Sequence, residues 1–179
     1  IETSEYNNYL DLPQIKSKNG LDSIPLFKNE RFSMIWKPRQ SQEPIKVLLV
    51  KTAIDFPIKD YDFGVPLGLW LLKSYISLQG INAIIDIYDE RLDLRCGRPT
   101  DFVDKICDYD MIGVSICSCE VPQALKKLQT AKSRGKITFV GGIFFLFNEK
   151  YLLDCGCIDY VIPGVGTLPL LNLLKELIK

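Results

Sequence analysis

The sequence contains no histidine, and this absence excludes more chemistry than any other feature of its composition. Without an imidazole the chain cannot build a serine–histidine or cysteine–histidine nucleophile pair, nor use histidine to ligate a metal. Apolar runs of the ~18 residues needed to span a bilayer are also absent. The 22 basic and 22 acidic residues give zero net charge, which argues against partners such as nucleic acid or an anionic membrane.

Cysteine is sparse, and its spacing raises the question of a metal site. Six cysteines in 179 residues are too few for a disulfide scaffold, and no signal peptide is visible, so we expect a reducing, cytoplasmic setting. Cys117-x-Cys119 and Cys155-x-Cys157 could be halves of a four-thiolate site. However, the expected strands place the pairs at opposite ends of the sheet, about 16 Å apart at ~3.3 Å per residue, so we predict no metal site. Four cysteines are predicted to be buried structural thiols: the two members of the second pair, Cys155 and Cys157, and the two single cysteines, Cys96 and Cys107.

The first 43 residues differ from the rest of the chain. They contain Pro13, Pro25 and Pro38 and show no sustained period of 2 or 3.6. We interpret residues 1–43 as an irregular leader, either wrapped against the body or solvated, and residues 44–179 as one domain. Because the chain starts at Ile1 without methionine, we expect it to be a piece of a longer protein.

From Ile45 onward, short apolar runs alternate with helical patterns. A turn is expected from Arg91 to Pro99, Thr100 is expected to cap a short helix, and Thr167 is expected to cap the last one. A helix opening at Pro66 is predicted to bury one stripe: Leu67, Trp70, Leu71, Tyr75 and Leu78. The predicted strands are 45–51, 82–88, 111–117, 137–140 and 158–162.

Five strands that are apolar on both faces and alternate with helices predict an α/β fold with a parallel sheet. The flavodoxin-like, Rossmann-like strand order 2-1-3-4-5, with helices on both faces, is expected, since it opens a ligand crevice at the carboxyl ends of the strands. Glycines are concentrated in the loops that leave this edge. Two explanations of these glycines are open: short turns between strand and helix require glycine, or the glycines let a ligand approach the backbone closely.

The loops at this edge do not match the usual phosphate-binding patterns. The first runs TAIDFPIKDYDFG in place of GxGxxG, GxxxxGK[ST] is absent, and Ser115 ends the third strand where a phospho-acceptor domain has aspartate. The edge is lined by glycine and hydroxyl groups and suits a bulky neutral ligand better than a phosphate.

Four segments in register resemble the cobalamin-binding domain of cobalamin-dependent radical S-adenosylmethionine enzymes. They are VPLGL at 65–69, IGVSI at 112–116, FVGG at 139–142 and DYVIPGVG at 159–166. The resemblance covers residues 45–179 and implies a corrinoid over the strand ends with its nucleotide tail descending between them. The cofactor-binding residues that it implies are Thr52, Pro66, Leu67, Gly68, Ser115, Cys117, Ser118, Gly141, Gly142, Phe144, Gly164 and Gly166.

The sequence departs from that family at three positions. Val165 and Thr167 stand where the family often has glutamate. Ile143 and Phe144 follow the glycine pair where the family often has proline, and Phe144 is expected to stack on or wall the pocket. The lack of histidine implies base-off cobalamin with no imidazole below the cobalt. The resemblance also implies a partner, which is the radical S-adenosylmethionine barrel of the same parent chain. This barrel and its 4Fe-4S cluster are expected in sequence beyond Lys179. The fragment alone is expected to bind cofactor without catalysis, the parent transferring a methyl group or rearranging a carbon skeleton.

Two other readings remain open at this stage. The same fold could have an empty edge and act as a docking or regulatory domain, with Phe144 and Phe145 filling the slot. Alternatively, an enzyme could work with carboxylates alone, for which Asp55, Asp60 and Asp62 are the candidates, although a solvated loop is the favoured explanation of these residues.

Overall fold

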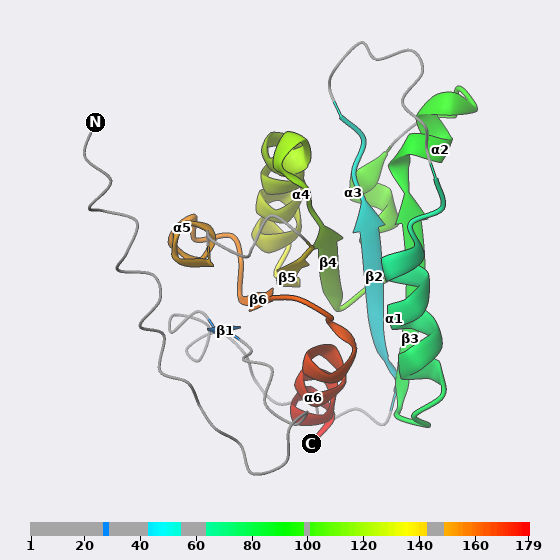
Figure 1. The fold of residues 1–179 in the computed structure, drawn as a ribbon, viewed down its shortest axis with the longest axis vertical. Coiled ribbons are helices and arrows are strands. Elements are labelled where there is room, and N and C mark those ends of the chain that lie inside the picture. The colour runs from blue at the N-terminus through cyan, green and yellow to red at the C-terminus, as the bar shows by residue number, and fades with distance from the viewer. Residues whose placement is uncertain (1–26, 29–42, 55–63, 99–100, 143–148) are drawn as a thin grey trace.

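A parallel sheet forms the centre of the computed structural model, which describes residues 27–28, 43–54, 64–98, 101–142 and 149–179 (Figure 1). Its parallel strands lie in the order β3-β2-β4-β5-β6, which is the predicted order 2-1-3-4-5. Their bounds are Ile45–Lys51 (β2), Ala83–Asp89 (β3), Met111–Ser115 (β4), Ile137–Gly141 (β5) and Tyr160–Ile162 (β6). The short strand β1, Phe27–Lys28, pairs antiparallel with β6. The rest of the predicted leader lies outside the described residues, except for Glu43.

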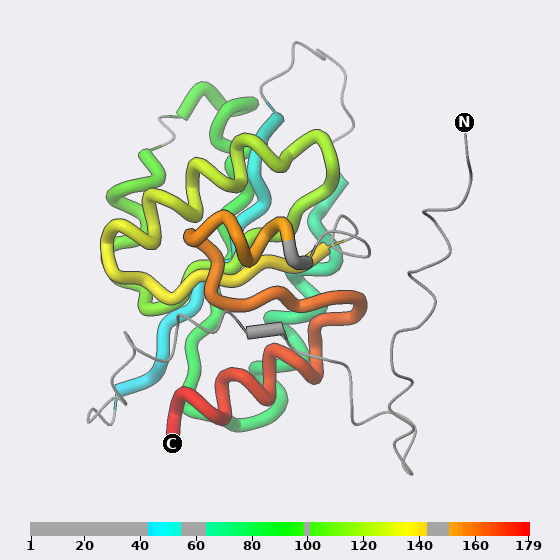
Figure 2. The backbone as a smooth tube through the Cα atoms, turned by 90° about the vertical axis from the view of Figure 1, so that its left-hand side faces the viewer, coloured from blue at the N-terminus to red at the C-terminus, as the bar shows by residue number. Residues whose placement is uncertain are grey.

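Helices cover both faces of the sheet (Figure 2). Their bounds are Leu67–Ser77 (α1), Glu90–Arg95 (α2), Phe102–Lys105 (α3), Val121–Ser133 (α4), Glu149–Asp154 (α5) and Thr167–Ile178 (α6), with a 3-10 turn, Ser118–Glu120 (η3), before α4. Helices α1 and α6 pack on one face, and α3, α4 and α5 pack on the other. No helix of the described ranges is long and apolar enough to cross a membrane.

Strand β2 shows why the strands had to be apolar throughout. Val47 and Leu49 face the core beneath α1 and α6, whereas Leu48 and Val50 face the core beneath α4. Successive side chains of a strand point to opposite faces, so a strand covered on both sides has no polar face to show. This double burial matches the place of β2 inside the sheet, between β3 and β4, with which it pairs in parallel.

The predicted buried stripe of α1 is wrong except at Tyr75, which is partly buried against the core. Leu69 and Ile76 are its buried side chains, whereas Leu67 is 74% exposed and Leu78 is 83% exposed. Because apolar residues occur all round this helix, their period does not single out the face that packs. As a result, Trp70 and other predicted core residues form an apolar surface.

Three local predictions also differ from the structure. The segment expected to be a turn after residue 90 contains α2, whose first turn is capped by the Asp89 carboxylate accepting from the Arg91 N–H. Asp101, not Thr100, caps α3, since its carboxylate accepts two backbone N–H groups. Thr167 is the first residue of α6 rather than its cap, a position that Gly166 occupies without a side-chain hydrogen bond.

The burial of the cysteines was predicted correctly only at Cys157. Cys96 and Cys107 are exposed and Cys155 is half-buried. Cys96 and Cys107 follow the short helices α2 and α3 at the molecular surface, which bury few side chains, and this accounts for their exposure.

Candidate functional site

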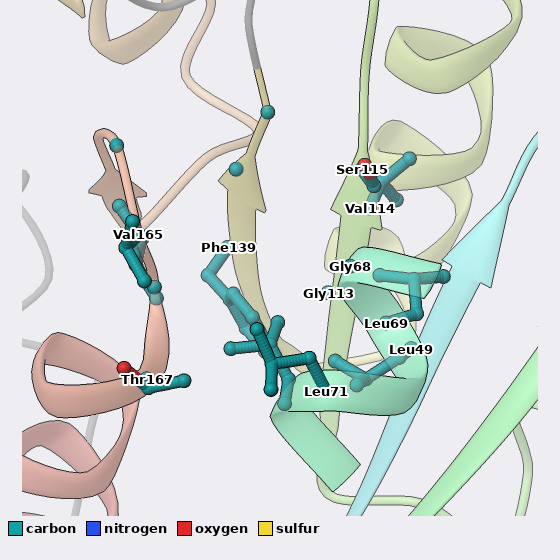
Figure 3. A pocket seen from close by; sticks show the side chains of 16 residues that line it. Leu49, Gly68, Leu69, Leu71, Gly113, Val114, Ser115, Phe139, Val165 and Thr167 are labelled. Carbon is teal, nitrogen blue, oxygen red and sulfur yellow. The ribbon is translucent and has the colours of Figure 1, made fainter. Parts of the chain in front are cut away.

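A cavity of about 270 Å³ opens at the carboxyl edge of the sheet, between the strands, α1 and the loop that leads into α6 (Figure 3). In Figure 3, Val165 and Thr167 lie on one side, Ser115 and Gly68 lie on the other, and Phe139 lies between them. We call this cavity the edge pocket. Its lining residues are Leu49, Gly68, Leu69, Leu71, Leu72, Gly113, Val114, Ser115, Phe139, Gly141, Gly142, Ile162, Gly164, Val165, Gly166 and Thr167.

Two glycines of the edge pocket are required by the fold itself. A Cβ at Gly113 would lie 2.1 Å from Cζ of Phe139, so the phenyl ring lies directly on the bare backbone of the neighbouring strand. Gly142 has φ +118°, and a Cβ there would lie 2.5 Å from the carbonyl oxygen of Ile116. A side chain at Gly113 would displace the Phe139 ring, and one at Gly142 would push against the backbone at Ile116.

Two other glycines have no such packing reason. A Cβ at Gly68 would meet nothing within 4 Å, and one at Gly141 would meet only the Ile162 carbonyl oxygen, at 3.4 Å. Glycine inside a helix costs about 1 kcal/mol relative to alanine, and glycine inside a strand costs about 0.5–1 kcal/mol. Both positions therefore keep the pocket wall free of side chains at some cost in stability.

The edge pocket is apolar and uncharged. None of the described residues that line it carries a charge, and its polar side chains are the hydroxyls of Ser115 and Thr167. The nearby charges are paired: Lys51 Nζ lies 2.5 Å from Glu120 Oε1, and the other oxygen of this buried carboxylate accepts the Cys117 N–H at 2.9 Å. Such a lining suits an uncharged, largely aromatic or aliphatic group.

Half of the twelve predicted cofactor-binding residues line the edge pocket. These six are Gly68, Ser115, Gly141, Gly142, Gly164 and Gly166. Pro66 and Leu67 precede Gly68 at the start of α1, and Cys117 and Ser118 follow β4 outside the lining. Phe144 lies outside the described residues, as do Phe145, Asp55, Asp60 and Asp62.

Thr52 lies at the end of β2 without lining the pocket. Its side chain is fully buried, and its Oγ1 makes no hydrogen bond with the part of the chain that the structure describes. A buried hydroxyl without a hydrogen-bond partner lowers the stability of the fold by about 1–3 kcal/mol. The Thr52 hydroxyl is such a group at the carboxyl edge of the sheet.

Sequence reasoning missed the side chains at the bottom of the pocket. Leu49, Phe139 and Leu72 read as ordinary core residues, because their apolar runs carry no sign of which end of the sheet is open. Gly113 could have been found, since a glycine inside a strand often marks the close approach of another group.

A second, smaller cavity of about 240 Å³ lies by Ala53, Glu90 and Lys127. The Glu90 carboxylate accepts the Ala53 N–H at 2.9 Å and lies 2.6 Å from Lys127 Nζ. Because both charged groups are already engaged with each other, this cavity has no charge available for a ligand.

The two cysteines after β4 lie together. The Sγ atoms of Cys117 and Cys119 are 3.4 Å apart, and both thiols are free. Burial, the contact with Cys119 and the Glu120 carboxylate raise the pKa of Cys117 to about 11. The described ranges hold no group of three or more cysteine, aspartate or glutamate side chains placed to bind a metal ion.

Comparison with known proteins gives the family. The model of the B12-binding domain matches residues 59–174, which include α1, every parallel strand after β2 and the first two thirds of α6. The chain belongs to the B12-binding domain family. This membership supports cobalamin as the ligand, and the matched range contains all but one of the residues that line the edge pocket, the exception being Leu49.

Two individual proteins are also similar. An uncharacterized methyltransferase from Pyrococcus horikoshii is 31% identical over 140 residues, which is 75% of this chain and 30% of that protein. The chain thus spans less than a third of that relative's length. A Bacillus subtilis protein whose name classes it with the phosphosugar isomerases aligns at 13% identity and a TM-score of 0.42, over 76% of this chain and 40% of that one.

Proposed function

We propose that this chain binds base-off cobalamin and holds the nucleotide tail of the cofactor in the edge pocket. The observation that carries the proposal is the bare wall at Gly68 and Gly141, where a side chain would fit the fold but would occupy the pocket. A dry apolar cavity of about 150 Å³ holds a benzene ring. The edge pocket, at about 270 Å³, has room for a bicyclic benzimidazole arm.

The residues present fit such an arm chemically. Leu49, Leu72 and Phe139 offer apolar contact to an aromatic ring, and the backbone at Gly141 allows close approach. Ser115 supplies a hydroxyl for a ring nitrogen or a ribose group at the strand end. In our proposal this chain orients the tail and excludes water from it, and the cobalt of the bound cofactor supplies alkyl-transfer chemistry.

The lower face of the cobalt would receive no imidazole from this chain. The sequence has no histidine, so with the tail withdrawn into the pocket neither the benzimidazole nor a histidine of this chain can ligate the metal from below.

We further propose that the chain is the N-terminal domain of a radical S-adenosylmethionine enzyme of the methyltransferase type. The support is the name of the Pyrococcus relative and the fraction of it that the chain spans. S-adenosylmethionine, a 4Fe-4S cluster and the catalytic barrel would then belong to sequence beyond Lys179. A three-cysteine CxxxCxxC segment in that sequence is expected, and its absence would reject the assignment of the parent.

A docking or regulatory domain without cofactor is the second candidate. The exposed apolar surface of α1, with Leu67, Trp70 and Leu71, favours this alternative because such a surface is suited to a protein partner. The two functions differ in whether the isolated chain takes up a corrinoid.

The test is uptake of cofactor by the full 179-residue chain. The protein is mixed with hydroxocobalamin, desalted and examined by absorbance, and about one equivalent of corrinoid is expected to remain with it. After reduction to the cobalt(II) form, the electron paramagnetic resonance lines should lack the splitting that an axial nitrogen causes. A colourless protein fraction would reject cobalamin binding, whereas a coloured fraction with nitrogen splitting would reject only the base-off form.

A further inference from the structure

Cys117 and Cys119 lie within reach of each other in a single short turn. Cys117 precedes η3, Cys119 lies within it, and their Sγ atoms are 3.4 Å apart. A disulfide needs a separation of about 2.05 Å. The Cys117 side chain also accepts a backbone N–H in the cap of η3, so closing the bond would exchange this contact for the disulfide within the same turn.

The two thiols differ in their access to solvent. Cys119 is exposed, whereas Cys117 is half-buried. The charged groups that face Cys117 are Glu120 and Lys51, and the carboxylate of Glu120 accepts its backbone N–H. A dissolved reagent therefore reaches Cys119 first, and Cys117 is placed to act on it in a second step.

We propose that Cys117 and Cys119 form a reversible disulfide at the rim of the edge pocket by exchange with a low-molecular-weight disulfide. Cys119, as thiolate, attacks one sulfur of the reagent, and a thiolate leaves with the bonding pair. Cys117 then loses its proton to solvent and attacks Sγ of Cys119, which releases a second thiolate. The protein loses two protons and two electrons, and the reagent disulfide is reduced to two thiols.

This site is independent of what the edge pocket binds. Cys117 and Cys119 do not line the pocket, although Ser115, two residues earlier in the chain, does. The high pKa of Cys117 keeps it protonated at neutral pH, so the second step rather than the first is expected to limit closure of the bond. The exchange should accordingly become faster as the pH rises toward 10.

The second C-x-C pair of the chain is a matched internal control. Cys155 Sγ donates to the Tyr151 carbonyl oxygen at 3.3 Å, and Cys157 is only 4% exposed. The spacing in sequence is the same, but Cys155 is directed back along α5 and Cys157 lies in the core. We expect no disulfide there under conditions that oxidise the first pair.

The experiment treats the reduced 179-residue chain with glutathione disulfide in the absence of oxygen, alkylates the remaining thiols and maps the peptides by mass spectrometry. Peptide 106–126 should carry one alkylated cysteine, Cys107, and should have lost two hydrogens between residues 117 and 119, and dithiothreitol should reverse this loss. Two alkylated thiols at 117 and 119, or a persistent glutathione adduct in the wild type, would overturn the proposal.

Two serine variants distinguish the thiol that reacts first from the thiol that closes the disulfide. Their readout is the adduct on the remaining cysteine, which does not require a change in folding. Cys117→Ser should stop at a stable glutathione adduct on Cys119, because the second thiol is missing. Cys119→Ser should remain unmodified at Cys117. Equal adduct formation in both variants would contradict the assignment of the exposed thiol as the first to react.

Discussion

Replacing Gly141 by valine tests whether the bare wall of the edge pocket exists for a ligand. The Cβ of the new side chain would meet only the Ile162 carbonyl oxygen, at 3.4 Å, which is an ordinary contact. Gly141 ends β5, and a β-branched residue favours extended backbone. The free energy of unfolding is therefore expected to stay level or to rise by up to about 1 kcal/mol.

The effect on binding should have the opposite sign. Valine adds three carbon atoms to the wall of a pocket of about 270 Å³. Each displaced methylene-sized contact is worth about 0.8 kcal/mol, so Gly141→Val should weaken binding by about 2.4 kcal/mol, or about 50-fold in Kd. Steric overlap with the tail would increase this loss, so the value is a lower limit.

The assay is equilibrium dialysis against two corrinoids, with a thermal melt of each protein. Cobalamin carries the nucleotide tail, whereas cobinamide lacks it. Gly141→Val should therefore weaken the binding of cobalamin and leave the binding of cobinamide unchanged. Ser133→Val, which adds carbon to the exposed end of α4, is the control and should change neither affinity. An unchanged Kd for cobalamin in a well-folded Gly141→Val protein, or an equal loss for cobinamide, would refute the reasoning.

The remaining predictions concern stability. Gly68→Ala should raise the midpoint of thermal unfolding by about 2–4 °C, since alanine favours the helix by up to about 1 kcal/mol and meets open space; a lower midpoint would show a packing constraint that the structure lacks. Glu120→Gln should lower the free energy of unfolding in urea by about 3 kcal/mol, because it leaves Lys51 unpaired, and a loss below about 1 kcal/mol would count against this pair. Burial raises the pKa of Cys117 from 9.0 to about 11 and, with Asp86, that of Tyr109 from 10.0 to about 12. The unfolded chain then releases these protons first, so stability should be level below about pH 9 and fall between pH 9 and 12; urea midpoints that rise over that interval would contradict the burial of both groups.

The sheet could be predicted from the sequence because its strands carry their own signal. The run at 45–51 is apolar on both faces, and the structure gives β2 those same bounds. Helix α1 shows the opposite case. Its residues are apolar all round, so the choice of Leu69 and Ile76 as the buried pair was decided by α6 and the sheet, which the local period does not encode. Helix α2 was missed because its six residues are too few to show a helical period, although Asp89 before it is a residue typical of a helix start.

The pocket could be predicted only in part, for a related reason. Gly141 and Gly142 directly follow an apolar run, so their place at the carboxyl edge follows from the strand assignment. The bottom of the pocket depends on a contact between neighbouring strands, in which Phe139 lies on Gly113. The strand order was expected, but nothing in the sequence states which side chains of adjacent strands lie opposite each other. The pairing of the Cys117 and Cys119 thiols likewise depends on the turn η3, which no sequence pattern marked.

The central claim, that the edge pocket holds the nucleotide tail of a corrinoid, is tested most directly by a crystal structure of the chain with cobalamin. The account predicts electron density for the benzimidazole arm against the backbone of Gly68 and Gly141, with its ring near Ser115. Cobalamin bound elsewhere, with the edge pocket empty or filled by neighbouring side chains, would contradict it.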